Sequence, residues 1–179
     1  MRKEFRVAGF GGQGVITIGV LMTKALGQYG DFYVAQTQSY GPEARGGACK
    51  TDVVFSDLEI DYIKPTQLDV MLSMSQPSLN AYAPYLPDSG ILIVDSSLIS
   101  NVPSRFSNVF SLPATALAED TLGMKVVANV IMFGALAAVT GWATPDACKK
   151  AVADTVPAKA LAKNYEAFDL GYCKFGEEK

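Results

Sequence analysis

The stretch that decides the fold is residues 4–29, which read EFRVAGFGGQGVITIGVLMTKALGQY. Its first part, Glu4 to Phe10, is a short run rich in Phe and Val that is cut off by glycines, a pattern that predicts a strand. From about Gly14 to Tyr29 apolar side chains recur at helical spacing, and Gly30 supplies the stop. With Phe32–Gln36 as a second strand, this arrangement is the beginning of a βαβ unit.

Four further apolar runs indicate strands, and the segments between several of them have a helical pattern. These runs cover residues 49–55, 68–74, 90–94 and 108–112. Asp57–Tyr62 follows the first run at hairpin distance, so part of the sheet has room to be antiparallel. We therefore expect an α/β fold with an open, mostly parallel Rossmann-like sheet, flanking helices and space for one antiparallel hairpin.

The C-terminal third is predicted to be helical. From Ala116 onward the sequence turns helical, with Val126–Thr140 as a buried helix. Two later helices are expected to start at Pro145 and Pro157, because proline suits the first helical turn. Thr144 is then the expected cap of the first of these two helices.

The composition excludes several classes of function. With 179 residues, of which 49% are hydrophobic, the chain can form one ordinary core, so we expect residues 1–179 to be a single domain. Its 15 Lys and Arg and 18 Asp and Glu give a net charge of -3 and form no block that suits nucleic acid. Histidine is absent, which removes Ser-His-Asp and Cys-His nucleophiles and most zinc sites.

The cysteines exclude clustered thiolate ligands. Cys49, Cys148 and Cys173 are too scattered for an iron–sulfur or zinc site. We therefore expect neither a metal site nor a catalytic residue in this chain. Residues 1–8 contain no apolar run of the kind found in a signal peptide, which predicts a cytoplasmic location.

One uncharged stretch, Val126–Pro145, has the 20 residues that a membrane span needs. Asn129 and two glycines dilute its apolar content, and a helix that is apolar on all sides suits a buried core or a subunit interface equally well. We therefore expect no membrane partner. A second uncharged stretch at residues 70–87 adds to the expectation that the chain buries surface against other subunits, or against itself when isolated.

Between the first strand and the first helix, Gly9-Phe10-Gly11-Gly12-Gln13-Gly14 fits the pattern G-x-G-x-x-G. Glycines let the backbone come close to a ligand, and free N–H groups at a helix start favour an anion. The alternative is a tight turn that holds no ligand. NAD is disfavoured, because the second strand ends in Gln36-Thr37-Gln38 and lacks the carboxylate that holds a ribose.

A second candidate segment follows the second strand and reads QSYGPEARGG over residues 38–47. Glycines and a proline fix an irregular backbone that displays Ser39, Tyr40 and Arg45. Arg45, followed by Gly46 and Gly47, has a guanidinium that can pair in a bidentate way with a phosphate or a carboxylate. The alternative is a surface loop in which the charges are simply solvated.

Other polar residues follow later strands and are expected along the same carboxyl edge of the sheet. They are Ser73, Ser75, Gln76, Asp95, Ser96 and Ser97. Asp95 is best interpreted as a strand-end or helix-cap aspartate. Asn129, the lone amide of an apolar helix, is interpreted as a satisfied core or interface group rather than a catalytic one.

The glycine segment and the segment QTQSYGPEARGG at residues 36–47 together closely resemble the gamma subunit of 2-oxoacid:ferredoxin (acceptor) oxidoreductases. The resemblance extends over nearly the whole chain. It implies a multisubunit enzyme that oxidatively decarboxylates a 2-oxoacid on thiamine diphosphate and releases CO2 and acyl-CoA. Electrons would pass through iron–sulfur clusters to ferredoxin or flavodoxin.

This chain departs from the parts of the family that carry the redox chemistry, since it has no clustered cysteines and no G-D-G…N segment for magnesium and diphosphate. The resemblance therefore implies that thiamine diphosphate, magnesium and the iron–sulfur clusters belong to partner subunits. The gamma chain would be a non-redox subunit that contributes to assembly and to the CoA side of the active site. The matched positions are Gly9, Gly11, Gly12, Gln13, Gly14, Ser39, Tyr40, Arg45, Gly46 and Gly47.

Within the family the two segments look most like the 2-oxoglutarate type, which makes succinyl-CoA. Pyruvate, branched-chain 2-oxoacid and indolepyruvate enzymes stay open as alternatives. So do a free-standing nucleotide- or CoA-binding α/β module and a purely structural subunit whose glycine turn holds no ligand.

Overall fold

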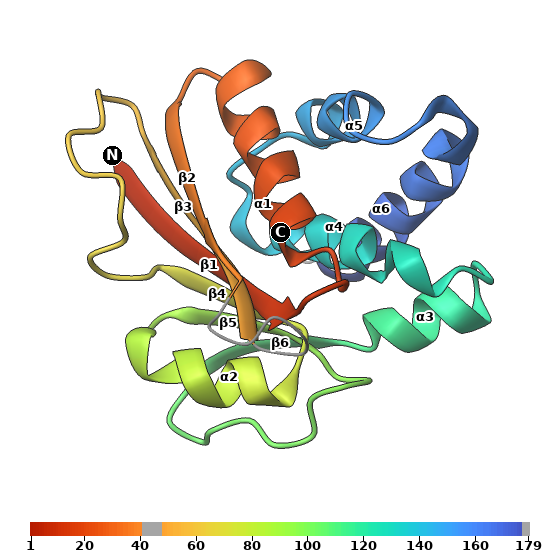
Figure 1. The fold of residues 1–179 in the computed structure, drawn as a ribbon, viewed down its shortest axis with the longest axis horizontal. Helices are drawn as coiled ribbons and strands as arrows, with labels where there is room; N and C mark the ends of the chain where they lie inside the picture. The colour runs from red at the N-terminus through yellow and green to blue at the C-terminus, as the bar shows by residue number, and fades with distance from the viewer. Residues whose placement is uncertain (41–47, 177–179) are drawn as a thin grey trace.

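A six-stranded sheet forms the centre of the chain, with the strand order β2-β3-β1-β4-β5-β6 (Figure 1). The computed structural model describes residues 1–40 and 48–176. The strands are β1 (Arg2–Phe10), β2 (Tyr33–Ser39), β3 (Ala48–Ser56), β4 (Val70–Ser73), β5 (Ile91–Asp95) and β6 (Asn108–Leu112). Strands β1, β4, β5 and β6 pair in parallel, so the expected mostly parallel sheet is confirmed.

The expected antiparallel part of the sheet is confirmed, but it does not lie where the sequence predicted it. Asp57–Tyr62 forms no strand, so the hairpin predicted there is wrong. The reason is that β3 already pairs on both sides, antiparallel to β1 and to β2, and has no free edge to offer. The βαβ unit is altered for the same reason: β2 runs parallel to β1, but β3 lies between them.

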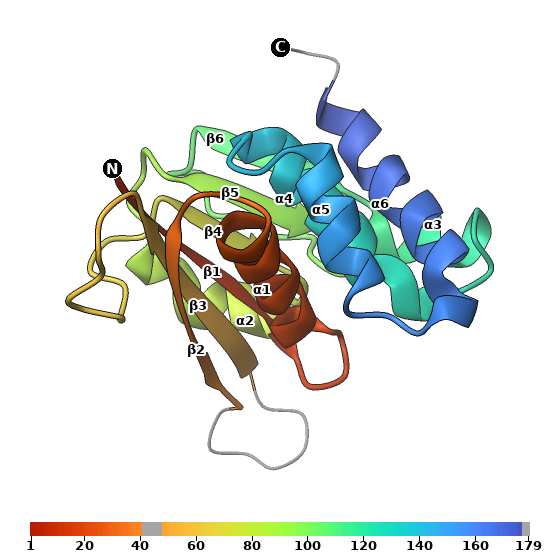
Figure 2. The ribbon, with the colours of Figure 1, turned by 90° about the horizontal axis from the view of Figure 1, so that it is seen from above.

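Helices cover both faces of this sheet, most of them on one side (Figure 2). The larger core joins that face to α1 (Val15–Thr23), α4 (Ala128–Thr140), α5 (Pro145–Ala153) and α6 (Leu161–Gly176), with α3 (Ala114–Asp120) at its margin. The smaller core lies under α2 (Gln76–Tyr82) on the other face. Because alternate residues of a strand face opposite ways, Val7 enters the larger core and Ala8 the smaller one.

Several helices begin or end close to the residues predicted from the sequence. The Thr144 hydroxyl accepts a hydrogen bond from the Ala147 N–H, which confirms the cap of α5. The first helix continues from α1 into a π-helical turn at Lys24–Gln28, which ends just before Gly30. The helix expected from Pro157 begins as a 3₁₀ turn at Ala158–Ala160 and becomes α-helical at Leu161.

Helix α4 is a core helix of this chain. Its residues from Ala128 to Ala138 are all buried, and Gly134 faces α6, where a Cβ would lie 2.8 Å from the Tyr172 backbone nitrogen. The predicted buried helix is therefore confirmed over Ala128–Thr140, where it packs against the chain's own helices, but Val126 lies in a preceding 3₁₀ turn and is 72% exposed. Among the described residues, no helix combines the length and apolar character needed to cross a membrane.

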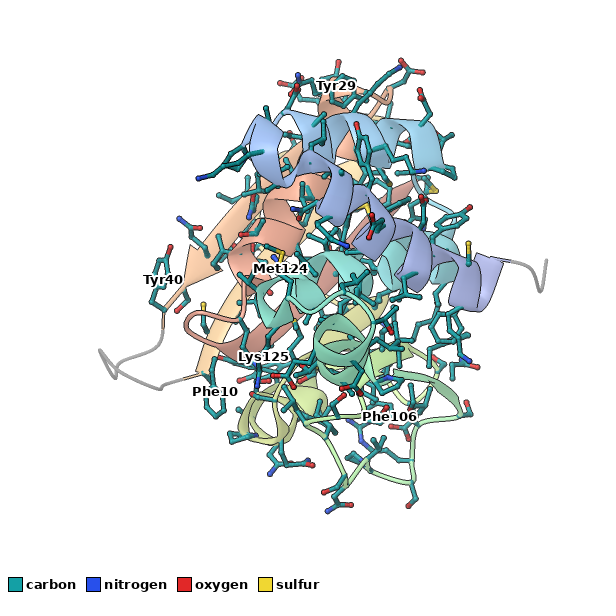
Figure 3. All side chains as sticks on the ribbon, turned by 90° about the vertical axis from the view of Figure 1, so that its right-hand side faces the viewer. Phe10, Tyr29, Tyr40, Phe106, Met124 and Lys125 are labelled. Atoms are coloured by element: carbon teal, nitrogen blue, oxygen red, sulfur yellow. The ribbon has the colours of Figure 1, made fainter. Side chains whose placement is uncertain are left out.

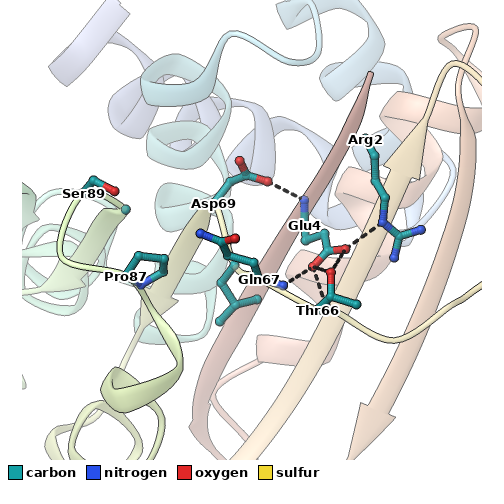
Figure 4. A pocket seen from close by; sticks show the side chains of 9 residues that line it. Arg2, Glu4, Thr66, Gln67, Asp69, Pro87 and Ser89 are labelled. Atoms are coloured by element: carbon teal, nitrogen blue, oxygen red, sulfur yellow. Dashed lines mark hydrogen bonds and ion pairs between the residues drawn. The ribbon is translucent and has the colours of Figure 1, made fainter.

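At the amino edge of the parallel strands, a polar pocket of about 380 Å³ surrounds the buried carboxylate of Glu4 (Figure 4). That carboxylate accepts hydrogen bonds from the Gln67 N–H at 2.8 Å, the Thr66 N–H at 2.5 Å and the Arg2 guanidinium at 2.7 Å. Burial raises the pKa of Glu4, but these bonds together outweigh it, so the pKa lies below its ordinary value of 4.5. The carboxylate thus fixes the segment that leads into β4.

Replacing Glu4 with glutamine is expected to lower the free energy of unfolding at neutral pH and to flatten its dependence on acid. A group whose folded pKa is depressed stabilises the fold above its ordinary pKa and loses that contribution as the pH falls through the folded value. Denaturant unfolding of both proteins at successively lower pH measures this. Glu59→Gln, at an exposed position, controls for the loss of one charge. Parallel curves for wild type and Glu4→Gln would refute the assignment.

Candidate functional site

The glycine turn, residues 9–14, joins β1 to α1 at the carboxyl edge of the parallel strands (Figure 1). Gly12 and Gly14 have φ angles of 92° and 73°, a left-handed conformation that side chains disfavour. The Gln13 amide locks the turn: its oxygen accepts from the Phe10 N–H at 2.6 Å, and its nitrogen donates to the Met74 carbonyl at 2.8 Å. Gln13 therefore ties the end of β1 to the residue that follows β4.

Gly11 differs from the other glycines of this turn. A Cβ at Gly9 would lie 2.6 Å from the Gln13 side chain, and Gly14 is equally crowded, so packing explains both. At Gly11 no atom of the described residues, apart from its two chain neighbours, lies within 4 Å of a Cβ position, and its φ lies outside the left-handed region. The described part of the fold therefore leaves the space above Gly11 open.

A cavity of about 360 Å³ lies beside the turn. Gly12 and Gln13 of the turn line it together with the segment that leads into α4. The other lining side chains are largely apolar; the full set is Gly12, Gln13, Met74, Leu98, Thr115, Lys125, Val126 and Ala128. Lys125 is the only charged residue among them, and its amine lies 3.2 Å from Glu119. The site thus combines an apolar cavity with a helix start that favours an anion.

The end of β2 lies along the same edge as the glycine turn. Ser39 pairs with Lys50 of β3, and Lys50 pairs in turn with Ala8 of β1, next to Gly9. Tyr40 follows with 63% of its side chain exposed, on the same side of the molecule as Phe10 in Figure 3. Arg45, Gly46 and Gly47 lie outside the described residues.

The polar residues after β4 and β5 serve the fold. Asp95 accepts hydrogen bonds from the Ser97 N–H at 3.0 Å and from the Thr115 hydroxyl at 2.6 Å, as its interpretation as a strand-end cap predicts. Ser75 caps α2, and Ser73 and Ser78 complete a buried network of hydroxyl groups. The Gln76 amide is bonded to the backbone of residues 100 and 101, while Ser96 is exposed.

One buried charged cluster escaped the sequence reasoning. Arg6 and Asp52 face each other across β1 and β3, with Nε to Oδ1 at 2.6 Å and Nη2 to Oδ2 at 3.1 Å. Lys50 contacts the same carboxylate at 2.6 Å, and the Arg6 guanidinium lies 5.1 Å from the Tyr82 ring of α2. The only signal was the alternation of charge at Lys50 and Asp52 within an apolar strand. Two cations share one carboxylate, so the cluster keeps one excess positive charge, and its contact with Tyr82 fastens α2 to the sheet.

The two buried thiols, those of Cys49 and Cys148, are not activated. Burial raises the pKa of the Cys148 thiol to about 12 and also raises that of Cys49, so neither is poised as a thiolate. Across residues 1–40 and 48–176, no three His, Cys, Asp or Glu side chains are grouped to hold a metal ion.

The sequence matches the family described as pyruvate ferredoxin/flavodoxin oxidoreductase over residues 4–173. It is 45% identical to the 2-oxoglutarate synthase subunit KorC of Methanothermobacter marburgensis, covering 96% of this chain and 95% of that protein. It is 29% identical to the pyruvate synthase subunit PorC of Methanocaldococcus jannaschii, covering 94% of each.

Solved structures agree with this comparison. The gamma subunit of a keto/oxoacid ferredoxin oxidoreductase from Geobacter sulfurreducens superposes with a TM-score of 0.89 at 37% identity, covering 97% of this chain and 96% of that one. A 2-oxoglutarate:ferredoxin oxidoreductase from Magnetococcus marinus, with 2-oxoglutarate, coenzyme A and succinyl-CoA bound, has a TM-score of 0.82 at 20% identity. The match covers 99% of this chain and 31% of that one and shows a common fold.

Proposed function

This chain belongs to the pyruvate ferredoxin/flavodoxin oxidoreductase family, and from that premise we propose that it is the gamma subunit of a 2-oxoglutarate:ferredoxin oxidoreductase. The observation that carries the proposal is its 45% identity with a 2-oxoglutarate synthase subunit over nearly the whole of both chains. Identity with a pyruvate synthase subunit of similar length is only 29%. The identities therefore favour 2-oxoglutarate over pyruvate, and a free-standing binding module is not favoured.

In this proposal the complex converts 2-oxoglutarate and CoA to succinyl-CoA and CO2 and passes the electrons to ferredoxin or flavodoxin. Thiamine diphosphate, magnesium and the iron–sulfur clusters belong to partner subunits, because the described residues of this chain do not fit them. Burial raises the pKa of the thiols of Cys49 and Cys148, and the carboxylates of the described residues form no metal-binding group. The chain acts as a single gamma-type domain over residues 1–179 in a cytoplasmic complex.

The role proposed for this chain is to form the CoA side of the active site. CoA carries phosphate groups at one end and a long pantetheine arm at the other. The start of α1 favours anions, and the adjoining cavity of about 360 Å³ has a largely apolar lining that suits the arm. The proposed contacts include the glycine turn, Ser39, Tyr40 and the Arg45-Gly46-Gly47 segment. No proton transfer is assigned to this chain.

Replacing Arg45 with alanine in the assembled complex is expected to raise the KM for CoA roughly tenfold, because one charged hydrogen bond to the cosubstrate is lost. The kcat at saturating CoA and the KM for 2-oxoglutarate should change little. Steady-state kinetics with a dye as electron acceptor measures all three constants. Lys159→Ala, at an exposed position outside the site, is the charge-matched control. An unchanged KM for CoA would remove Arg45 from the site.

A further inference from the structure

A pocket of about 290 Å³ lies at the C-terminal end of the helix that starts at the glycine turn. Its lining residues come from the π-helical turn, from the segment that leads into β2 and from the connection between α4 and α5. Three of them are aromatic, namely Tyr29, Phe32 and Trp142. Figure 3 shows Tyr29 at the other end of the molecule from Phe10 and Lys125, so this pocket is separate from the cavity beside the glycine turn.

Contacts with neighbouring residues hold the three rings in place. Phe55, which is fully buried, packs edge to face against Phe32, with ring centroids 5.2 Å apart, and against Trp142, with centroids 4.9 Å apart. The Tyr29 hydroxyl donates a hydrogen bond to the Asp154 carboxylate. A ligand therefore meets aromatic side chains that are already oriented, which lowers the entropic cost of binding.

The charge at this pocket favours a cation. Asp31 is the one charged residue among the described residues that line it, and its exposed carboxylate forms no hydrogen bond or ion pair with any of the described residues. The end of the helix adds the negative end of the helix dipole, and its last turn contains no basic residue. The pocket thus offers three aromatic rings and one free carboxylate, and no lysine or arginine of the described chain lines it.

Aromatic rings and a carboxylate attract the same class of ligand. The face of an aromatic ring is electrostatically negative and binds cations, most strongly in tryptophan. An organic ammonium ion suits such a pocket because its charge is attracted by the rings while its alkyl groups are buried against apolar walls. We propose that the pocket binds a small organic ammonium ion, whose charge lies against the three rings and pairs with Asp31. This site is independent of the function proposed for the glycine turn.

The test is titration of the purified full chain with choline, and with the alcohol in which a carbon atom replaces the choline nitrogen. Trp142 is the only tryptophan of the chain, so tryptophan fluorescence reports directly on the pocket. Choline is expected to change this fluorescence saturably and to bind at least about tenfold more tightly than the alcohol, because only choline carries the charge. Sodium chloride at matched ionic strength separates binding from a general effect of salt.

Asp31→Asn removes the carboxylate and should weaken choline binding about threefold, while binding of the alcohol stays unchanged. The melting temperature of this variant should equal that of wild type, because Asp31 pairs with no described residue. Phe32→Leu keeps an apolar side chain without the ring and should also weaken the binding of choline more than that of the alcohol. Asp61→Asn changes the net charge equally at an exposed position outside the pocket and should bind choline as wild type does.

Equal affinity of wild type and Asp31→Asn for choline would overturn the proposal. So would equal binding of choline and the alcohol, because the pocket would then select for apolar surface and not for charge. A tryptophan fluorescence that does not respond to choline beyond the effect of sodium chloride would overturn it as well.

Discussion

Gly171→Ala is expected to destabilise the chain by at least about 3 kcal/mol, enough to lower the melting temperature by roughly 10 °C or to prevent soluble expression. A Cβ at Gly171 would overlap the carbonyl group of Ile131, with its carbon 2.7 Å away, and would lie 3.1 Å from the Ala135 nitrogen. All of these are backbone atoms of α4. Unlike a flexible side chain, they cannot change conformation to relieve the overlap. Since α4 is the central helix of the larger core, it cannot move without repacking its neighbours.

Thermal unfolding of the purified chain measures this effect, and Gly11→Ala is the matched control. The same methyl group is added there to a turn where no described residue other than the chain neighbours lies within 4 Å, so the melting temperature should stay near that of wild type. If both variants melted together with wild type, α4 and α6 would not be packed backbone to backbone. The close approach of these helices would then be refuted.

Gly11→Val is expected to leave the stability of the fold unchanged, in contrast to Gly171→Ala. It should instead lower the kcat/KM for CoA about a hundredfold in the assembled complex. Around an added Cβ the described residues leave open space, and the backbone at this position is not left-handed. In the proposed function the open space above Gly11 belongs to CoA, so a branched side chain excludes the cosubstrate or displaces it. Packing of the fold therefore requires glycine at positions 9 and 14, whereas binding of the ligand requires glycine at position 11.

The measurement is CoA-dependent turnover of the complex, together with the melting temperature of the variant chain. Gly11→Ala adds a smaller group and should give an intermediate loss of kcat/KM. Wild-type kinetics for Gly11→Val would mean that nothing approaches this position during catalysis. The glycine turn would then be a structural connection without a ligand.

Local patterns in the sequence predicted the elements well. Apolar runs located all six strands, and Thr144 located the start of α5. The pairing of the strands could not be predicted in the same way. Alternation of apolar and polar residues indicates which face of the sheet a residue lies on, but it does not indicate which strand is the neighbour. The insertion of β3 between β1 and β2 depends on contacts between distant parts of the chain, and no local signal carries it.

Contacts between distant parts of the chain also determine features of the packing and of the site that local patterns did not predict. Only the structure shows that Gly134 of α4 lies against the backbone of α6 in the same chain. Arg6 looked like an ordinary strand residue because its partner, Asp52, is far away in the sequence. The glycine turn was predicted from the spacing of its residues, whereas the open space at Gly11 depends on its three-dimensional surroundings.

The most direct test of the account is to tag this chain in its native host, purify it gently and assay the eluate for reduction of a viologen dye. Larger chains should co-elute with it, and dye reduction should require both CoA and 2-oxoglutarate, with pyruvate a much poorer substrate. A chain that elutes alone and inactive, under conditions in which other iron–sulfur enzymes of the host keep their activity, would contradict the proposed complex. An active complex that prefers pyruvate would contradict the proposed substrate.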